Sequence, residues 1–141
     1  MTPRQIDLVQ SSFEDVRPIA DTAARLFYQR LFELDPSLRS LFRSNMEEQG
    51  RKLMDTLGVI VGHLRWLDRI MPGIRALGAR HSQYGVKRSD YAVVGQALID
   101  TLQIGLGAGF TADVAEAWLA AYTLLANAMT EEQEQPRAVN Y

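Results

Sequence analysis

The sequence predicts an all-α fold of seven to eight helices, and three observations carry this prediction. Apolar residues recur at spacings of three and four along nearly the whole chain, which is the period of one helix face. No segment shows the sustained alternation of apolar and polar residues that is typical of a half-buried strand. Proline and glycine divide the chain into segments of uneven length, which favours a non-bundle α fold over a four-helix bundle.

The first half of the chain is expected to form four helices, three of which begin at a proline. Thr2-Pro3 has the pattern of a helix cap followed by proline in the first turn. Pro18 marks the second start, and Asp35-Pro36 repeats the cap-proline pattern. The expected helices cover about 3–13, 19–32, 36–42 and 49–64, with a polar connection over 43–48.

The second half is expected to form a short helical fragment or turn followed by three helices. The fragment covers 67–72, and the helices cover about 72–83, 89–104 and 111–129. Pro72 is expected to start the first of these helices, and Gly85 to follow its end, because glycine suits the left-handed conformation there. Gly105, Gly107 and Gly109 are expected to break the second helix. We predict one domain over 1–132 and a frayed tail over 133–141.

Composition excludes several classes of function. The 141 residues suit one domain, 47% of them are hydrophobic, and the net charge is −2 without a basic stripe, so nucleic acid is not an expected partner. Cysteine is absent, which excludes disulfides and thiolate metal sites. The N-terminus lacks the pattern of a signal peptide, and the most apolar stretch, 57–61, is too short to span a bilayer. A soluble cytoplasmic protein is expected.

The chain has only two histidines, His63 and His81. A lone histidine is more often structural or solvated than a ligand. His81 has no His or Glu three or four residues away, which disfavours zinc, since zinc needs three or four protein ligands. Haem iron, in contrast, is held by one histidine while the macrocycle supplies the other donors. That interpretation of His81 requires a pocket formed elsewhere in the chain.

Residues that could form such a pocket come from three predicted helices. Gln49 and Leu53 are four apart and therefore share one helix face, with Lys52 next to it. Tyr28 and Phe42 come from two other helices. Each also has a simpler explanation: Tyr28 as an aromatic at the edge of the core, Phe42 as a packing residue, and Gln49 and Lys52 as solvated residues.

The order and spacing of several short motifs resemble the globin family. Single-domain bacterial haemoglobins and the haem domain of flavohaemoglobins are the most similar, and the stretch around 51–54 also resembles neuroglobins. The resemblance spans roughly Ile6 to Gln133. It rests on Phe27-Tyr28, Leu34-Asp35-Pro36-Ser37-Leu38 with Leu41-Phe42, Gln49-Gly50-Arg51-Lys52-Leu53-Met54, His81 with Tyr84-Gly85-Val86, Asp90-Tyr91, and Glu116 to Tyr122.

The resemblance implies a globin fold around a haem b pocket, and it assigns five residues to that pocket. His81 matches the proximal histidine that binds the iron, and Phe42 matches the phenylalanine that stacks on the haem face. Gln49 and Tyr28 match the distal positions that face a bound gas, and Leu53 closes the pocket. A tyrosine hydroxyl and a glutamine amide can both donate hydrogen bonds to a ligand that carries partial negative charge.

The resemblance also assigns residues at the pocket edge. Lys52 and Arg80 could each reach a haem propionate, although for both a solvated side chain remains an equal or better explanation. Tyr91 matches a flavohaemoglobin tyrosine that pairs with a glutamate of the last helix to polarise the proximal histidine. Gln133 takes the place of that glutamate here, which favours a more neutral proximal histidine. Glu131, Glu132 and Glu134 lie near, but on other helix faces.

Two further features are expected to have no role at the iron. His63 lies fourteen residues beyond Gln49, about 21 Å along a straight helix, and is interpreted as a helix-end histidine. The run Gly105-Leu106-Gly107-Ala108-Gly109 superficially matches a dinucleotide fingerprint, but it follows a helix and ends at Phe110 rather than glycine. We interpret it as a turn, so this stretch carries no flavin or nicotinamide site to re-reduce an iron.

The leading functional hypothesis is reversible binding of dioxygen, and also of NO or CO, at ferrous haem iron. The alternative is a nitric oxide dioxygenase, with Tyr28, Gln49 and Tyr91 as catalytic residues, that converts NO and dioxygen to nitrate with an external reductase. A haem-based gas sensor is a third hypothesis, disfavoured because no output domain fits in 141 residues. The assembly is expected to be a monomer or homodimer, and no membrane partner is expected.

Overall fold

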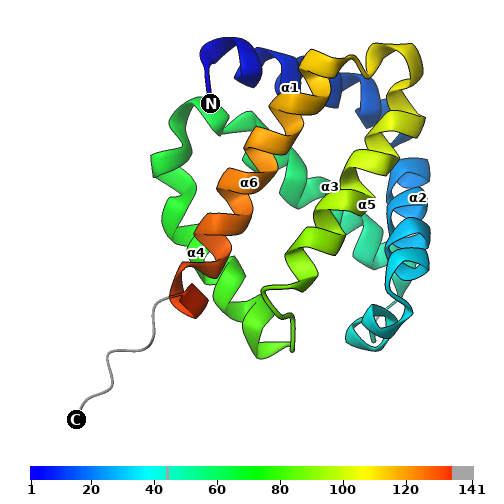
Figure 1. Cartoon of the computed structure of the whole chain (residues 1–141), viewed down its shortest axis with the longest axis vertical. Coiled ribbons are helices and arrows are strands. Elements are labelled where there is room, and N and C mark those ends of the chain that lie inside the picture. The colour runs from blue at the N-terminus through cyan, green and yellow to red at the C-terminus, as the bar shows by residue number, and fades with distance from the viewer. Residues whose placement is uncertain (44, 135–141) are drawn as a thin grey trace.

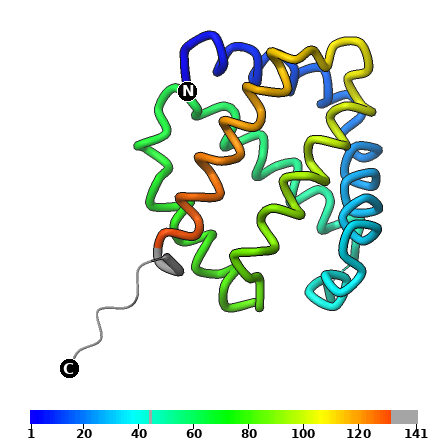
Figure 2. The backbone as a smooth tube through the Cα atoms, in the orientation of Figure 1, coloured from blue at the N-terminus to red at the C-terminus, as the bar shows by residue number. Residues whose placement is uncertain are grey.

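The computed structural model describes residues 1–43 and 45–134, and for residues 132–134 it describes the backbone alone. This part of the chain is all-helical, as predicted, and Figures 1 and 2 show its helices crossing one another at steep angles. The α-helices are α1 (Pro3–Val16), α2 (Ala20–Leu34), α3 (Met46–Gly62), α4 (Leu67–Gln83), α5 (Asp90–Leu106) and α6 (Ala112–Glu134). The 3₁₀ helices are η1 (Arg17–Ile19), η2 (Pro36–Leu41), η3 (Leu64–Trp66) and η4 (Gly107–Gly109).

Several helix ends follow the local chemistry of the sequence. Thr2 accepts a hydrogen bond from the backbone of Gln5, whose side chain in turn accepts from the backbone of Thr2, so α1 begins with a complete capping box. The Thr111 hydroxyl accepts from the Val114 N–H at the start of α6. Gly85 follows the end of α4 at φ 99°, the left-handed conformation expected there.

Three helix boundaries differ from the predictions. The segments 67–72 and 72–83 form one helix, α4, so Pro72 lies inside a helix instead of starting one, and six α-helices are described instead of seven or eight. Pro72 is the sixth residue of α4, where proline removes one intrahelical hydrogen bond without ending the helix. The segment 43–48 is not wholly a connection, because Asn45 caps α3 through Glu47 N–H and α3 begins at Met46. The α5 helix continues through Gly105, and the chain turns only at Gly107, where φ is 54°.

The helices pack in a few extensive pairs: α2 on α5, α4 on α6, α1 on α6 and α2 on α3. The core between α1 and α6 surrounds the indole of Trp118, which is 3% exposed. The indole N–H donates to the buried hydroxyl of Ser12 over 2.8 Å. The α4 helix packs mainly on α6 and makes few contacts with α3, so these two helices diverge after η3 (Figure 1).

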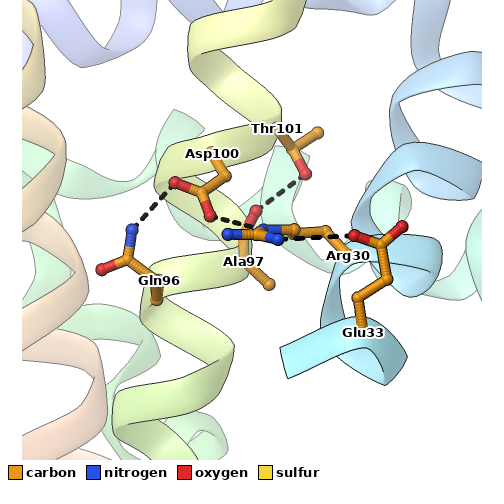
Figure 3. A network of polar contacts seen from close by, with 6 residues as sticks. All are labelled: Arg30, Glu33, Gln96, Ala97, Asp100 and Thr101. Carbon is orange, nitrogen blue, oxygen red and sulfur yellow. Dashed lines mark hydrogen bonds and ion pairs between the residues drawn. The ribbon is translucent and has the colours of Figure 1, made fainter. Parts of the chain in front are cut away.

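A polar network joins the outer surfaces of α2 and α5 (Figure 3). The Arg30 guanidinium donates to Asp100 over 2.7 Å and to Glu33 over 3.4 Å. Gln96 donates to the other Asp100 oxygen over 2.8 Å. These bonds help to set the rotation of α2, the helix that carries Tyr28, about its own axis relative to α5.

No helix in the described part of the chain is both long and apolar enough to cross a membrane. The predicted frayed tail is described only where it continues α6 to Glu134, and 135–141 lie outside the described residues. The predicted domain boundary at 132 therefore stays a prediction.

Candidate functional site

One apolar cluster brings together side chains that the sequence places on separate helices. Tyr28 is 6% exposed, and its ring centroid lies 5.3 Å from that of Phe42, edge to face. Leu53 of α3 packs against the same cluster. The remaining members are Phe27, Leu31, Leu38, Ala97, Phe32, Leu41, Met46, Val93, Val94 and Leu98. The cluster therefore unites the three elements that were expected to form a pocket, α2, η2 with Phe42, and α3, and it adds α5, which was not.

The Tyr28 hydroxyl is hydrogen-bonded to the Gln49 side chain inside this cluster. Burial raises the pKa of Tyr28 above its ordinary value, and the Gln49 hydrogen bond offsets part of that rise. Burial therefore keeps Tyr28 protonated. A hydroxyl carries one proton as well as acceptor lone pairs, so it can both accept and donate a hydrogen bond.

Close contact between α2 and α3 accounts for this pairing. A Cβ on Gly50 would lie 3.0 Å from the Cβ of Ala24, and Gly50 itself is buried. The two helices thus approach one another at the residue that directly follows Gln49. A glycine at this position allows the glutamine amide to reach the tyrosine of the neighbouring helix.

His81 lies on α4, in its last turn, with its imidazole held by its own helix. The ring Nδ1 lies 2.8 Å from the carbonyl oxygen of Leu77. Since a carbonyl can only accept, Nδ1–H is the donor, and in the neutral ring Nε2 keeps an unprotonated lone pair. His81 is partly buried. The ring is therefore oriented and in the tautomer that a metal ligand bonded through Nε2 requires.

The same local contact occurs at His63, whose Nδ1 lies 2.7 Å from the carbonyl oxygen of Val59. His63 follows the end of α3 and is also partly buried, so the tautomer alone does not separate the two histidines. Their positions in the fold distinguish the two histidines. His63 lies at the opposite end of α3 from Gln49, in agreement with the length of helix that separates them.

Tyr91 lies in the first turn of α5, beside α4 and α6. It packs against the buried cluster of Ile74, Ala128 and Met129, and burial raises its pKa. Its hydroxyl is buried and has no hydrogen-bond partner among the described residues. The Tyr122 hydroxyl of α6 donates to the Tyr91 carbonyl over 2.6 Å, which holds this turn of α5 against α6.

The other residues considered at the pocket edge are placed as follows. Lys52 and Arg80 are both exposed, as either a propionate contact or a solvated role requires. Glu131 forms an ion pair with Arg75 at 2.9 Å, so its carboxylate is engaged away from Tyr91. The side chain of Gln133 lies outside the described residues, as do those of Glu132 and Glu134.

Comparison with known proteins agrees with this geometry. A family model described as Globin matches residues 25–129, about three-quarters of the chain. The chain belongs to the globin family. The matched region runs from α2 into α6 and contains Tyr28, Gln49 and His81, so the resemblance stated from the sequence is confirmed.

Two kinds of globin are represented among its relatives. The chain is similar to Neuroglobin-1 of Oncorhynchus mykiss, with 31% identity over 92% of this chain and 91% of the relative. It is similar to the neuroglobin of Danio rerio, with 30% identity over 87% of this chain and 86% of the relative. The Flavohemoprotein of Vibrio cholerae is 25% identical over 94% of this chain but only 34% of its own length.

Membership in the globin family implies haem binding and small gas ligands, and the residues present fit a haem. His81 offers an oriented Nε2 lone pair from α4. The partly buried residues of the apolar cluster include Phe42, Leu53, Val94 and Leu98, whose surfaces are not fully covered by other protein atoms. A planar macrocycle that is apolar except at its propionates needs one such ligand and such an apolar lining.

Several residues that complete the apolar cluster, or let helices approach closely, were not predicted from the sequence. Val94, Ala97 and Leu98 of α5 complete the apolar cluster, although the sequence predicted only a helix over 89–104. Gly50 and Gly78 let neighbouring helices approach closely. The available signal was a glycine in a helix interior next to a candidate site residue, where helix propensity alone disfavours it.

Proposed function

We propose that this globin binds dioxygen reversibly at ferrous haem b, with NO and CO as further ligands. The observation that carries the proposal is the buried hydrogen-bonded pair of Tyr28 and Gln49, together with a histidine on another helix whose tautomer leaves Nε2 free. When bound, the haem would supply an open coordination position at which a diatomic gas can be held. The protein side of this function consists of three contributions.

The first contribution is orientation of the proximal ligand. The Leu77 carbonyl accepts the Nδ1 proton of His81, which prevents rotation of the ring and keeps the proton away from Nε2. Because a neutral carbonyl accepts this bond, the imidazole is less basic than one paired with a carboxylate. This agrees with a carrier of gas rather than an enzyme that must cleave an O–O bond.

The second contribution is hydrogen bonding to a polar ligand on the distal side. Tyr28 keeps its proton because burial raises its pKa, and its O–H can donate to a ligand that carries partial negative charge. Gln49 holds the hydroxyl in place through its amide. Each such bond is worth about 1–1.5 kcal/mol, or roughly a tenfold change in affinity.

The third contribution is exclusion of water. Phe42 packs edge to face on the Tyr28 ring and Leu53 belongs to the same apolar cluster, and an apolar environment strengthens the hydrogen bonds formed in it. Lys52 and Arg80 are exposed, and we assign them to the haem propionates because charged groups of that kind remain at a pocket's solvent edge. Apolar walls with a charged rim would hold the group in a single orientation.

Replacement of each histidine by alanine tests this proposal. Reconstitution of the His81→Ala protein with haemin should lose the Soret band of the wild-type complex. The matched variant His63→Ala removes a histidine with the same i−4 carbonyl contact and should keep that band. A wild-type protein without a Soret band, or a His81→Ala protein with an unchanged one, would reject the proposal.

A second candidate function is nitric oxide dioxygenase, in which NO, dioxygen and one electron give nitrate. The buried hydroxyl of Tyr91 favours it, because this hydroxyl has no hydrogen-bond partner among the described side chains and Tyr91 packs against the cluster between α6 and α4, the helix that carries His81. Sustained turnover would require an external reductase as partner. Rapid mixing of the oxygenated protein with NO measures the single turnover: stoichiometric nitrate supports this function, and its absence leaves a carrier, either as a monomer or as a homodimer.

A further inference from the structure

The backbones of α4 and α6 meet closely at Gly78. A Cβ built on Gly78 would lie 2.1 Å from the carbonyl oxygen of Met129 and 2.6 Å from its Cα. Real Cβ atoms essentially never approach other atoms so closely, and the contacted atoms are backbone, which no side-chain rotation can move away. The α4 backbone therefore lies directly on the α6 backbone at this point, with a Gly78 α-hydrogen aimed at the Met129 oxygen.

Other contacts along the same pair of helices hold this arrangement in register. Arg75 of α4 forms an ion pair with Glu131 of α6 at 2.9 Å. Ile74, Ala128 and Met129 form a buried cluster between the two helices. Figures 1 and 2 both show the C-terminal half of α4 crossing the C-terminal half of α6. The contact at Gly78 is thus part of an extensive helix pair.

This contact is one helical turn from the histidine. Gly78 precedes His81 by three residues, about 4.5 Å along the axis, and residues three apart lie on neighbouring parts of one helix face. The residue before Gly78 is Leu77, whose carbonyl accepts the His81 Nδ1–H and whose side chain packs on the Ile74 cluster. A displacement of α4 at Gly78 therefore moves both the histidine and the carbonyl that orients it.

We propose that Gly78 is a positioning residue: its backbone contact with Met129 is a rigid stop that sets how far His81 extends toward the haem iron. The proposal rests on the proposed function, since it assumes that His81 binds the iron. The distance from a methyl group at position 78 to the Met129 oxygen would have to grow from 2.1 Å to 3.4 Å, by about 1.3 Å, to reach ordinary van der Waals contact. Because packed helices shift as units, this displacement reaches Nε2 of His81 largely undiminished.

The first test compares Gly78→Ala with Gly73→Ala. Both glycines lie in α4 and gain the same helix propensity on becoming alanine, but a Cβ at Gly73 meets nothing within 4 Å. In Gly78→Ala, the Fe–His stretching band of the ferrous protein should shift, and the CO dissociation rate should change by about threefold or more. That is well below the roughly hundredfold that 1 Å can cost at a catalytic site. In Gly73→Ala, both quantities should match the wild type.

A detached ligand separates positioning from general damage to the fold. In His81→Gly protein supplied with imidazole, the iron ligand is no longer attached to α4. Adding Gly78→Ala to this background should leave the Fe–imidazole stretching band unchanged. In the apoproteins, nitrogen NMR of the His81 ring should show a changed Nδ1–H signal in Gly78→Ala and an unchanged one in Gly73→Ala.

A third variant keeps the inference testable if Gly78→Ala does not fold. Met129→Ala removes the side chain that packs near Leu77 but leaves the carbonyl that meets Gly78. If the backbone contact is what positions His81, the Met129→Ala protein should have lower thermal stability but an unshifted Fe–His stretching band. A shifted band in Met129→Ala, or an unshifted one in a folded Gly78→Ala, would overturn the inference while leaving haem binding intact. Failure of the wild type to bind haem would instead reject the proposed function.

Discussion

Replacing Tyr28 with phenylalanine tests the distal side of the site with the least disturbance of the fold. The ring of Tyr28 is 6% exposed and lies 5.0 Å from Phe27, 6.1 Å from Phe32 and 5.3 Å from Phe42, centroid to centroid. Phenylalanine keeps this aromatic cluster and removes only the hydroxyl. The change therefore deletes the proposed donor to the gas ligand and the hydrogen bond with Gln49.

The expected magnitude follows from the loss of one hydrogen bond in a dry environment. About 1–1.5 kcal/mol of stabilisation of a polar ligand corresponds to a roughly tenfold faster dissociation of dioxygen. CO carries less partial charge than dioxygen, so its dissociation should change much less. The free energy of unfolding of the apoprotein should fall by no more than about 1 kcal/mol, since the ring packing is retained.

Stopped-flow measurement of dioxygen and CO dissociation provides the assay, with Tyr122→Phe as the control. Tyr122 is also a partly buried tyrosine with one hydroxyl hydrogen bond, to the Tyr91 carbonyl, but it lies outside the cluster that holds Tyr28. Tyr122→Phe should lower stability without accelerating dioxygen release. Equal dioxygen dissociation in Tyr28→Phe and wild type, or equal effects on dioxygen and CO, would refute the distal role of this hydroxyl.

Three further predictions concern the stability of the fold. Burial raises the pKa of Tyr28, Tyr91 and Tyr122 above the ordinary value of 10.0, so these tyrosines lose their protons in the unfolded chain before they do in the folded one. The free energy of unfolding should therefore be unaffected by these groups below about pH 10 and should fall as the pH rises above it. The urea midpoint measures this fall, which should be less steep in Tyr122→Phe. Ser12→Ala leaves the buried Trp118 N–H without its acceptor and should lower the free energy of unfolding in urea by about 1–3 kcal/mol. The control, Ser11→Ala, changes the exposed neighbouring serine and should lower it hardly at all. Equal losses in the two variants would contradict this account. Arg30→Ala removes the partly exposed ion pairs with Asp100 and Glu33 (Figure 3) and should lower the urea midpoint slightly, by less at 1 M salt. Arg25→Ala serves as the control, and a loss of stability that does not depend on salt would argue against an ionic origin.

Much of the fold could be predicted from local patterns in the sequence. Helix period, the Thr2 capping box, the Thr111 cap and the left-handed Gly85 all depend on residues within one or two turns of one another. The wrong boundaries were those at which distant packing overrides a local signal. Pro72 predicts a helix start, yet α4 passes through it, because one missing hydrogen bond is outweighed by the packing of that helix on α6.

The candidate site was predictable as a set of residues but not as an arrangement. The sequence by itself determined which side chains are available: a histidine without other metal ligands near it, two hydrogen-bonding groups and apolar residues, in an order similar to that of globins. Only the tertiary structure decided that Gln49 of α3 pairs with Tyr28 of α2. It also showed that Gly50 and Gly78 lie where two helix backbones meet. Such close contacts depend on the crossing of helices distant in sequence, and a glycine in a helix interior indicates only that some contact needs the space, not which helix makes it.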